Sequence, residues 1–186
     1  MIVKILYIII LVLEARVLYL SAKARGWMVF VFYTQLSNMA ATISAILAML
    51  FSATPMIILL RYISSCMLVM TFFVTTCILV PMGGSVKMLL FSEIGFYLHV
   101  VIPILSVGSY LALEDHVSSD ACILLSTVLT FIYGMIMLYL NHKGVVDGPY
   151  PFFKVRKQTA GTTVLWMSAL TCVIALISFA VFKLSV

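Results

Sequence analysis

The stretch GTTVLWMSALTCVIALISFAVF, residues 161–182, decides the fold class of this chain. It contains no charged side chain. Its length matches the roughly 20 apolar residues that an α-helix needs to cross the hydrocarbon core of a bilayer. The stretch therefore predicts a membrane-spanning helix rather than a buried helix of a soluble protein.

Further apolar runs of similar length precede this stretch. Short polar or charged segments separate them, so helices joined by short loops account for almost all of the 186 residues. We expect an all-α integral membrane bundle of about six transmembrane helices that forms one domain over residues 1–186. The expected spans are residues 2–20, 27–51, 56–80, 88–113, 121–140 and 161–182.

The composition indicates the same class of protein. Hydrophobic residues make up 65% of the chain and charged residues 9%, whereas soluble domains are about 25% charged. So few charges cannot cover a water-exposed surface, which excludes a soluble enzyme, a disordered chain and a disulfide-stapled secreted module. The net charge of +5 comes from basic residues scattered singly at the ends of apolar runs, which excludes a nucleic-acid binder. The expected partners are membrane lipids.

No motif in the sequence indicates a cofactor. The four cysteines lie inside or at the edges of apolar runs without paired spacing, and no cluster of ligand residues argues for a metal. We therefore expect no cofactor and no metal, with the cysteines packed as small hydrophobic side chains.

The first run, residues 2–20, has some features of a signal peptide. Lys4 precedes a short apolar core, and small residues follow at 21–24. Glu14 and Arg16 interrupt that core, so we interpret the run as a true span rather than a cleaved leader. Each of these two charges is expected to pair with another helix or to extend toward the interface.

Basic residues indicate which side of the membrane each loop faces, because cytoplasmic loops are enriched in lysine and arginine. The first, third and fifth loops hold Lys23, Arg25, Lys87, Lys143, Lys154, Arg156 and Lys157. The termini and the other loops hold Lys4, Arg61 and Lys183. We expect the odd-numbered loops in the cytoplasm, both termini outside and, in a bacterial cell, insertion into the inner (plasma) membrane.

The second run carries polar residues on one helical face. Thr34, Ser37 and Asn38 occupy positions i, i+3 and i+4 of a segment expected to lie in hydrocarbon, where an unsatisfied polar group is costly. One interpretation is a hydrogen-bonded seam between helices, since serine and threonine also bond their own backbone carbonyls. The other interpretation is part of a reactive site.

The fourth run contains the one histidine that we place deep within an expected span, His99. Pro103 lies four residues later and cannot donate the amide hydrogen that would bond the His99 carbonyl, so we expect the helix to bend here. A titratable ring beside a freed carbonyl inside a membrane is a candidate functional group. A structural histidine is the alternative.

These two features are expected at similar depths in the membrane. At about 1.5 Å per residue, Thr34 lies about 13 Å past Arg25. By the same measure, His99 lies about 18 Å past Lys87. A hydroxyl and an imidazole at matched depth can form a nucleophile–base pair that attacks an acyl carbon. Asn38, one turn from Thr34, is a candidate for orienting the pair or for donating to an oxyanion.

The longest loop, residues 141–160, combines glycine and proline with an aromatic cluster, which forbids regular helix. Aromatic side chains at a membrane boundary are commonly interfacial anchors. The loop is therefore either an amphipathic linker or part of the lining of a site. The side chains that we take as candidates for lining a site are Tyr33, Pro103, Tyr150 and Phe152.

Three short stretches carry a family resemblance: FYTQLSN at residues 32–38, LHVVIP at 98–103 and YPFF at 150–153. In this order and spacing they resemble the androgen-induced-gene membrane protein family, which includes the androgen-dependent protein that regulates tissue-factor-pathway inhibitor. The resemblance covers roughly residues 10–180, and this short chain is most similar to the small bacterial members.

The resemblance implies an activity. Animal members of the family are multi-pass threonine hydrolases that cleave fatty acid esters of hydroxy fatty acids. Thr34 matches their nucleophilic threonine, and His99 matches their catalytic histidine. The resemblance therefore implies an intramembrane hydrolase of long-chain acyl esters, with Thr34 attacking and His99 acting as general base.

The chain departs from the family at one point. Many relatives carry a polar residue about one turn before the histidine, where this chain has Gly95 and Phe96. A supporting hydrogen bond to the histidine is then either missing or supplied by Ser37, Asn38 or Glu93. Ser37 is also the alternative nucleophile, and the resemblance alone favours Thr34 over it.

Two other classes of function remain open on the sequence. A transporter or binding protein for an amphiphile or ion would use His99 as a proton-sensitive switch, and charges such as Glu14 and Arg16 often mark transport pathways. A structural subunit would show neither turnover nor flux and would tolerate substitution of Thr34.

Overall fold

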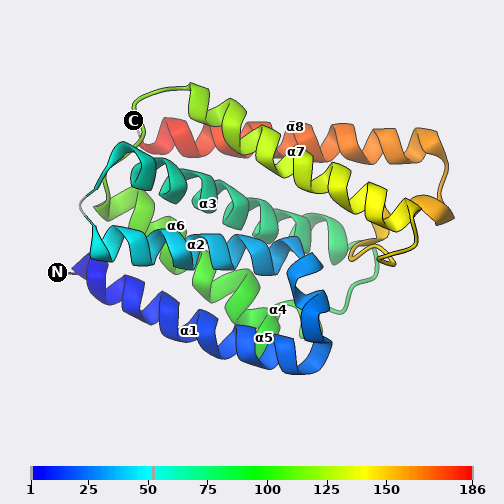
Figure 1. The fold of residues 1–186 in the computed structure, drawn as a ribbon, viewed down its shortest axis with the longest axis horizontal. Helices are drawn as coiled ribbons and strands as arrows, with labels where there is room; N and C mark the ends of the chain where they lie inside the picture. The colour runs from blue at the N-terminus through cyan, green and yellow to red at the C-terminus, as the bar shows by residue number, and fades with distance from the viewer. Residues whose placement is uncertain (1, 52, 186) are drawn as a thin grey trace.

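The computed structural model describes residues 2–51 and 53–185, which form helices and connecting loops with no β-strand among them. The long helices pack side by side in one bundle (Figure 1). This confirms the all-α class. The α-helices are α1 (Ile2–Arg25), α2 (Tyr33–Leu50), α3 (Pro55–Phe73), α4 (Val86–Leu90), α5 (Glu93–Phe96), α6 (Ile102–Leu113), α7 (Ala121–His142) and α8 (Ala160–Ser185).

Short segments of 3-10 or π geometry extend and join these helices. Two of them are π turns inside longer helices: η2 continues α3, and η3 joins α5 to α6. The segments are η1 (Gly26–Val31), η2 (Val74–Leu79), η3 (Tyr97–Val101), η4 (Pro151–Phe153) and η5 (Val155–Lys157).

Among the residues that the structure describes, four helices are long and apolar enough to cross a membrane: Pro55–Leu79, Glu93–Leu113, Ala121–His142 and Ala160–Ser185. They correspond to four of the six expected spans. Large apolar side chains such as Leu124, Ile132 and Leu165 are exposed on α7 and α8, a surface suited to contact with lipid. The four helices support an integral membrane protein.

The first two expected spans form helices that are not among these four. The expected span 27–51 is not one continuous helix, because Gly26 has a φ of +58° and Phe32 is extended, so that α2 begins only at Tyr33. Many of the side chains that α2 buries are polar. The count of six transmembrane helices therefore stays a prediction.

The expected span 88–113 is also interrupted. The chain turns at residues 91–92 between α4 and α5, and the Ser92 hydroxyl accepts the Gly95 N–H at 3.0 Å, which caps the new helix. The apolar residues before this cap form the separate short helix α4, whose end packs against α5.

Helix α3 lies at the centre of the bundle, in contact with α2, α6, α7 and α8. Figure 1 shows α7 and α8 on one side of it and α1 with α4–α6 on the other. The start of α1 and the end of α8 lie at the same end of the bundle (Figure 1).

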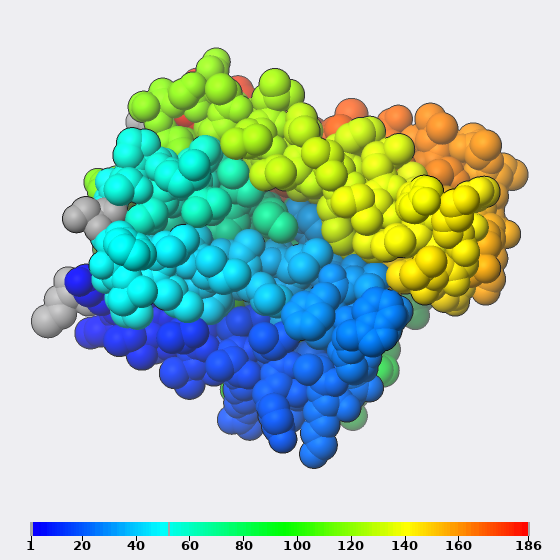
Figure 2. Space-filling view, in the orientation of Figure 1, coloured from blue at the N-terminus to red at the C-terminus, as the bar shows by residue number. Residues whose placement is uncertain are grey.

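The opposite end of the bundle gathers the start of α2, the end of α3, the short helices α4 and α5, and the loop after α7. In Figure 2 the blue η1 segment lies against the yellow end of α7. The Tyr133 hydroxyl of α7 donates to the Val31 carbonyl at 2.8 Å, which joins the two segments. This end of the molecule holds the candidate site.

One topological assignment is wrong. Arg61 was counted with the residues of the termini and even-numbered loops, but it lies in α3, within the expected span 56–80, with 1% of its surface exposed. Its partner Glu114 follows α6 and is distant in sequence, so no local pattern reveals the pair. With Arg61 set aside, Lys4 and Lys183 remain as the basic residues near the two termini, against seven assigned to the odd-numbered loops.

Candidate active site

The structure brings Thr34 and His99 together. Thr34 lies in the first turn of α2, and His99 lies in the π turn η3. Thr34 Oγ1 and His99 Nε2 are 3.5 Å apart, and both residues are buried. Their proximity agrees with the matched depths predicted from the sequence. A separation of this kind is at the long end for a hydrogen bond, as is common for a catalytic pair without substrate.

Backbone carbonyls hold the other side of the His99 ring. His99 Nδ1 lies 2.7 Å from the Leu89 carbonyl oxygen and 3.1 Å from that of Gly95. Since a carbonyl only accepts, Nδ1 carries the hydrogen and donates it. In a neutral ring Nε2 is then the acceptor, so its lone pair faces the Thr34 hydroxyl. This is the tautomer that a general base needs.

Gly95 explains how the Leu89 carbonyl reaches the ring. A Cβ atom at position 95 would lie 2.5 Å from the carbonyl oxygens of both Leu89 and Met88, closer than any real side chain tolerates. The absence of a side chain thus lets the end of α4 close on α5. The support for His99 comes from this backbone, whereas we expected it to be either missing or supplied by Ser37, Asn38 or Glu93.

Tyr150 is the second neighbour of the Thr34 hydroxyl. Its hydroxyl oxygen lies 3.2 Å from Thr34 Oγ1 and accepts the Thr34 backbone N–H at 3.3 Å. That N–H belongs to the first turn of α2, where amide hydrogens have no partner within the helix. Because the Tyr150 oxygen accepts this bond, its own hydrogen is free to be donated to an oxygen at the Thr34 side chain.

Aromatic packing fixes Tyr150 in the loop after α7. Its ring stacks on Phe152 with centroids 5.2 Å apart and meets Phe32 edge-on at 6.0 Å. Burial raises the pKa of the Tyr150 phenol above its ordinary value near 10, so the group stays protonated at neutral pH. The loop is therefore part of the lining of the site.

Two cavities meet at Thr34 and Tyr150, and both residues line both of them. The wide cavity has a volume of about 560 Å³ and is also lined by His99, Arg25, Gln35 and Ser92. The narrow cavity has a volume of about 50 Å³ and is lined mainly by apolar side chains of α3, α7, α8 and the loop.

Among the described residues, neither Ser37 nor Asn38 is found in the lining of these two cavities. Ser37 donates to the Thr34 carbonyl at 2.9 Å and lies 2.8 Å from the Thr71 hydroxyl. Asn38 donates through its amide nitrogen to the carbonyls of Thr34 and Leu98, at 2.7 and 3.1 Å. Both fully buried residues therefore act as the hydrogen-bonded seam, and Asn38 has its amide hydrogens committed rather than free for an oxyanion.

The expected lining residues divide into two groups. Tyr33 and Phe152 line the narrow cavity, as Tyr150 does. Pro103 is absent from the described lining of both cavities and lies at the start of α6, directly after the π turn that carries His99. Proline has no amide hydrogen to donate, and the wider π turn tolerates this missing backbone hydrogen bond. Pro103 therefore shapes the helix around His99 rather than the cavity.

The charged residues that the sequence singled out in or near the expected spans have partners on neighbouring helices. Glu93 forms an ion pair with Arg16 at the surface between α5 and α1. Glu14 is buried and accepts a hydrogen bond from the Gln35 amide. Within the described chain, Glu14 Oε2 and Gln35 Oε1 have no hydrogen-bond partner.

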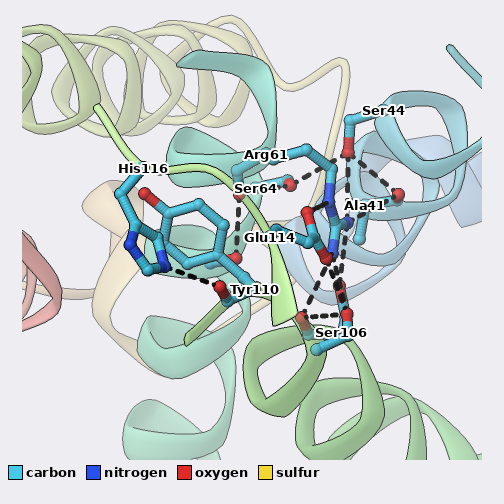
Figure 3. A network of polar contacts seen from close by, with 10 residues as sticks. Ala41, Ser44, Arg61, Ser64, Ser106, Tyr110, Glu114 and His116 are labelled. Atoms are coloured by element: carbon cyan, nitrogen blue, oxygen red, sulfur yellow. Dashed lines mark hydrogen bonds and ion pairs between the residues drawn. The ribbon is translucent and has the colours of Figure 1, made fainter. Parts of the chain in front are cut away.

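A second buried polar cluster lies farther along α2 and was not predicted. Arg61 pairs with Glu114 at 2.7 Å and also donates to the carbonyl oxygens of Ala41 and Ser106 and to serine hydroxyls (Figure 3). The serine hydroxyls are those of Ser44, Ser106 and Ser109. The contacts of Arg61 with α2 begin at Ala41, about 10 Å along the helix from Thr34.

Comparisons with protein families, with curated proteins and with solved structures give no match for this chain. Any function therefore has to be argued from the geometry of the site. The sequence did not predict two features of the site: the Leu89 carbonyl beside His99 and the direct contact of Tyr150 with Thr34. Neither has a local sequence signal, because one is a backbone group and the other depends on a loop more than a hundred residues away.

Proposed function

We propose that this protein is an intramembrane lipid esterase that hydrolyses long-chain acyl esters, such as fatty acid esters of hydroxy fatty acids. The observation that carries the proposal is the Thr34–His99 pair, with the base nitrogen 3.5 Å from the hydroxyl and the opposite ring nitrogen held by carbonyls. The pair opens onto a large cavity, and four apolar helices support a location in the lipid bilayer. The family resemblance in the three short stretches supports the same activity.

The reaction begins when Thr34 Oγ attacks the ester carbonyl carbon while its hydrogen passes to His99 Nε2. The bond to the alcohol oxygen then breaks, and His99 returns the proton to that oxygen. A water molecule next attacks the acyl-threonine with His99 again as base, which releases the fatty acid and restores Thr34. One ester and one water thus give one acid and one alcohol.

Tyr150 and the start of α2 supply the electrostatic support. The Tyr150 hydroxyl, whose oxygen already accepts the Thr34 N–H, donates its hydrogen to the oxygen that becomes negative. The first turn of a helix carries partial positive charge, which favours negative charge on Thr34 as it attacks. These groups are in place before the reaction, so little reorganisation is needed.

We further propose six transmembrane helices, with α1 and α2 added to the four apolar ones, and odd-numbered loops in the cytoplasm. Seven basic residues are assigned to those loops, against Lys4 and Lys183 near the termini and Arg16 and Arg61 within helices. The wide cavity, lined by Arg25 and Ser92 near the ends of α1 and α4, would then face the cytoplasmic side of the membrane.

A transporter is the second candidate, and one observation favours it. Glu14 is buried in α1, and its hydrogen-bond partner Gln35 lines the wide cavity. Ionisable groups inside membranes often mark proton or ion pathways. Flux of an amphiphile or ion into liposomes without ester turnover would favour this function over hydrolysis.

Hydrolysis of long-chain acyl esters by the purified protein tests the proposal. Thr34→Ala should abolish turnover, and His99→Ala should lower it about 10²–10⁴-fold, the usual effect of losing a general base. Thr34→Ser is the matched control because it keeps the hydroxyl and should retain measurable activity. Full activity in both alanine variants would contradict the mechanism.

A further inference from the structure

The two cavities that meet at Thr34 differ in one catalytic group. His99 lines the wide cavity, and in the described part of the chain it is not among the residues that line the narrow one. An ester bound at Thr34 has two arms, an acyl arm and an alcohol arm, which leave the reacting carbon in different directions. The position of His99 determines which arm occupies which cavity.

The leaving oxygen must lie on the side of His99. After the attack by Thr34, the proton on His99 Nε2 is transferred to the alcohol oxygen as its bond to the acyl carbon breaks. This transfer needs the alcohol oxygen within hydrogen-bond reach of Nε2, and His99 lines the wide cavity. The alcohol arm therefore occupies the wide cavity, and the acyl arm is directed to the other side of Thr34.

The wall of the narrow cavity is suited to a hydrocarbon chain. Most of its side chains are apolar, including Met70, Val74 and Leu170. Four threonines besides Thr34 also line it, and each of their hydroxyls already has a hydrogen-bond partner within the protein. The pairs are Thr71 with the Ser37 hydroxyl, Thr75 with the Thr71 carbonyl, Thr130 with the Tyr33 hydroxyl and Thr171 with the Met167 carbonyl.

The size of the narrow cavity matches part of an acyl chain. Its volume of about 50 Å³ holds only a few methylene-sized groups. Its wall includes Phe131, whose side chain is 41% exposed on the outer surface of α7. A long fatty acyl chain would thus be bound near its carboxyl end, and the rest of it would extend past α7 into the bilayer.

We propose that the narrow cavity is the acyl-chain subsite, which binds the first methylenes of a straight fatty acyl group, and that the wide cavity takes the alcohol part. This assignment rests on the proposed esterase function. The acyl group is transferred from the ester oxygen to Thr34 Oγ while its chain stays in the narrow cavity, and water then releases it as the fatty acid.

Gly134 and Met167 set the width of this subsite. A Cβ atom at Gly134 would lie 2.7 Å from Met167 Cε and 3.2 Å from its sulfur, so the two residues meet across the cavity wall. A larger side chain at position 134 fills the space, and a smaller one at position 167 enlarges it. One methylene too many or too few in an apolar pocket typically changes kcat/KM about 10–200-fold.

Acyl-chain profiles of two variants test the assignment. Gly134→Leu should lower kcat/KM for long straight acyl esters at least 10-fold relative to acetyl esters of the same alcohol. Met167→Ala should shift preference toward branched acyl groups. Gly108→Leu is the matched control, because a Cβ there meets nothing within 4 Å and the position is exposed on α6. Unchanged profiles in both folded variants would overturn the subsite.

Photo-crosslinking gives a readout that does not need turnover. The probe is a long-chain fatty acid with a diazirine near its carboxyl end, applied to the wild-type protein and to Thr34→Ala. Crosslinks to Met167, Leu170 or Val74 support the acyl subsite even if no ester is hydrolysed, in which case the esterase function alone fails. Crosslinks confined to Leu79, Met82 or Met88 of the wide cavity, together with normal hydrolysis, would overturn the subsite and leave the esterase function standing.

Discussion

Two of the buried polar clusters in the described part of this bundle, Arg61–Glu114 and Thr34–His99, differ in how fully their groups are paired. In the Arg61–Glu114 cluster every guanidinium nitrogen donates to an oxygen, and both carboxylate oxygens accept (Figure 3). In the Thr34–His99 pair, the Thr34 hydroxyl at 3.5 Å is the one hydrogen-bond partner of His99 Nε2 within the described residues, and His99 lines a cavity of about 560 Å³. A saturated cluster holds helices together, whereas an open one leaves a group available for chemistry.

Substitutions in the two clusters are therefore expected to have different consequences, one for stability and the other for the proposed reaction. Burying an ion pair is favourable only when the partners stay together, so removing one of them leaves an unpaired charge in the bundle. Removing a group from an open site affects the reaction while leaving most packing intact. Substitutions in the two clusters should therefore change different measurements.

The largest effect is expected from Arg61→Ala. The side chain of Glu114 is only 7% exposed, so its carboxylate would lose its counter-charge inside the bundle, at a cost of about 3–5 kcal/mol. Thermal unfolding in detergent measures the loss. Replacing both partners with apolar residues, as in Arg61→Met with Glu114→Leu, should recover most of it. The control is Arg16→Ala, which breaks the exposed pair with Glu93 and should cost less than about 1 kcal/mol.

The next effect is expected from Tyr150→Phe, with turnover as the measurement. The substitution keeps the stacked ring but removes the hydroxyl beside Thr34, so kcat should fall about 10²–10³-fold, as when an oxyanion donor is lost. The raised pKa of Tyr150 keeps this donor protonated, so its titration should not lower activity below about pH 10. Unchanged kcat in the phenylalanine variant would remove Tyr150 from the mechanism.

A somewhat smaller loss is expected from Gly95→Ala. The added Cβ would push the Leu89 carbonyl away from His99 Nδ1 and misplace the ring, and a displacement of about 1 Å can cost about 10²-fold in rate. Gly108→Ala is the matched control, since it adds the same atom where nothing lies within 4 Å. Equal rates in the two variants would show that the carbonyl support of His99 is dispensable.

The smallest effect is expected from Ser37→Ala, which distinguishes the two candidate nucleophiles. Ser37 is fully buried and bonded to Thr34 and Thr71, so its loss should lower stability by about 1 kcal/mol. Turnover should stay close to that of the wild type. A loss of activity comparable to that of Thr34→Ala would assign the attack to Ser37 instead.

The features that the sequence predicted depend on the length of apolar runs and on short motifs. Four spans could be located because lipid requires long apolar stretches with few charges. Thr34 and His99 could be singled out because few polar groups lie inside the expected spans. The beginning of α2 was missed because Trp27–Phe32 is as apolar as a span, while the backbone turns at Gly26.

The rest depended on contacts between distant segments. Nothing near Arg61 in the sequence shows that it is buried, because its partner Glu114 follows a different helix. The partners of His99 are carbonyl groups, which every residue carries and no motif marks. Pattern and resemblance therefore singled out Thr34 and His99, which the structure places together, but not the groups that orient them.

Labelling with a fluorophosphonate probe, followed by mass-spectrometric mapping of the modified residue, tests the central claim most directly. The account predicts a covalent adduct on Thr34 that is strongly reduced in His99→Ala, because the base that activates the hydroxyl is then gone. Labelling should persist in Ser37→Ala. An adduct on Ser37, or ester hydrolysis that continues in Thr34→Ala, would contradict the account.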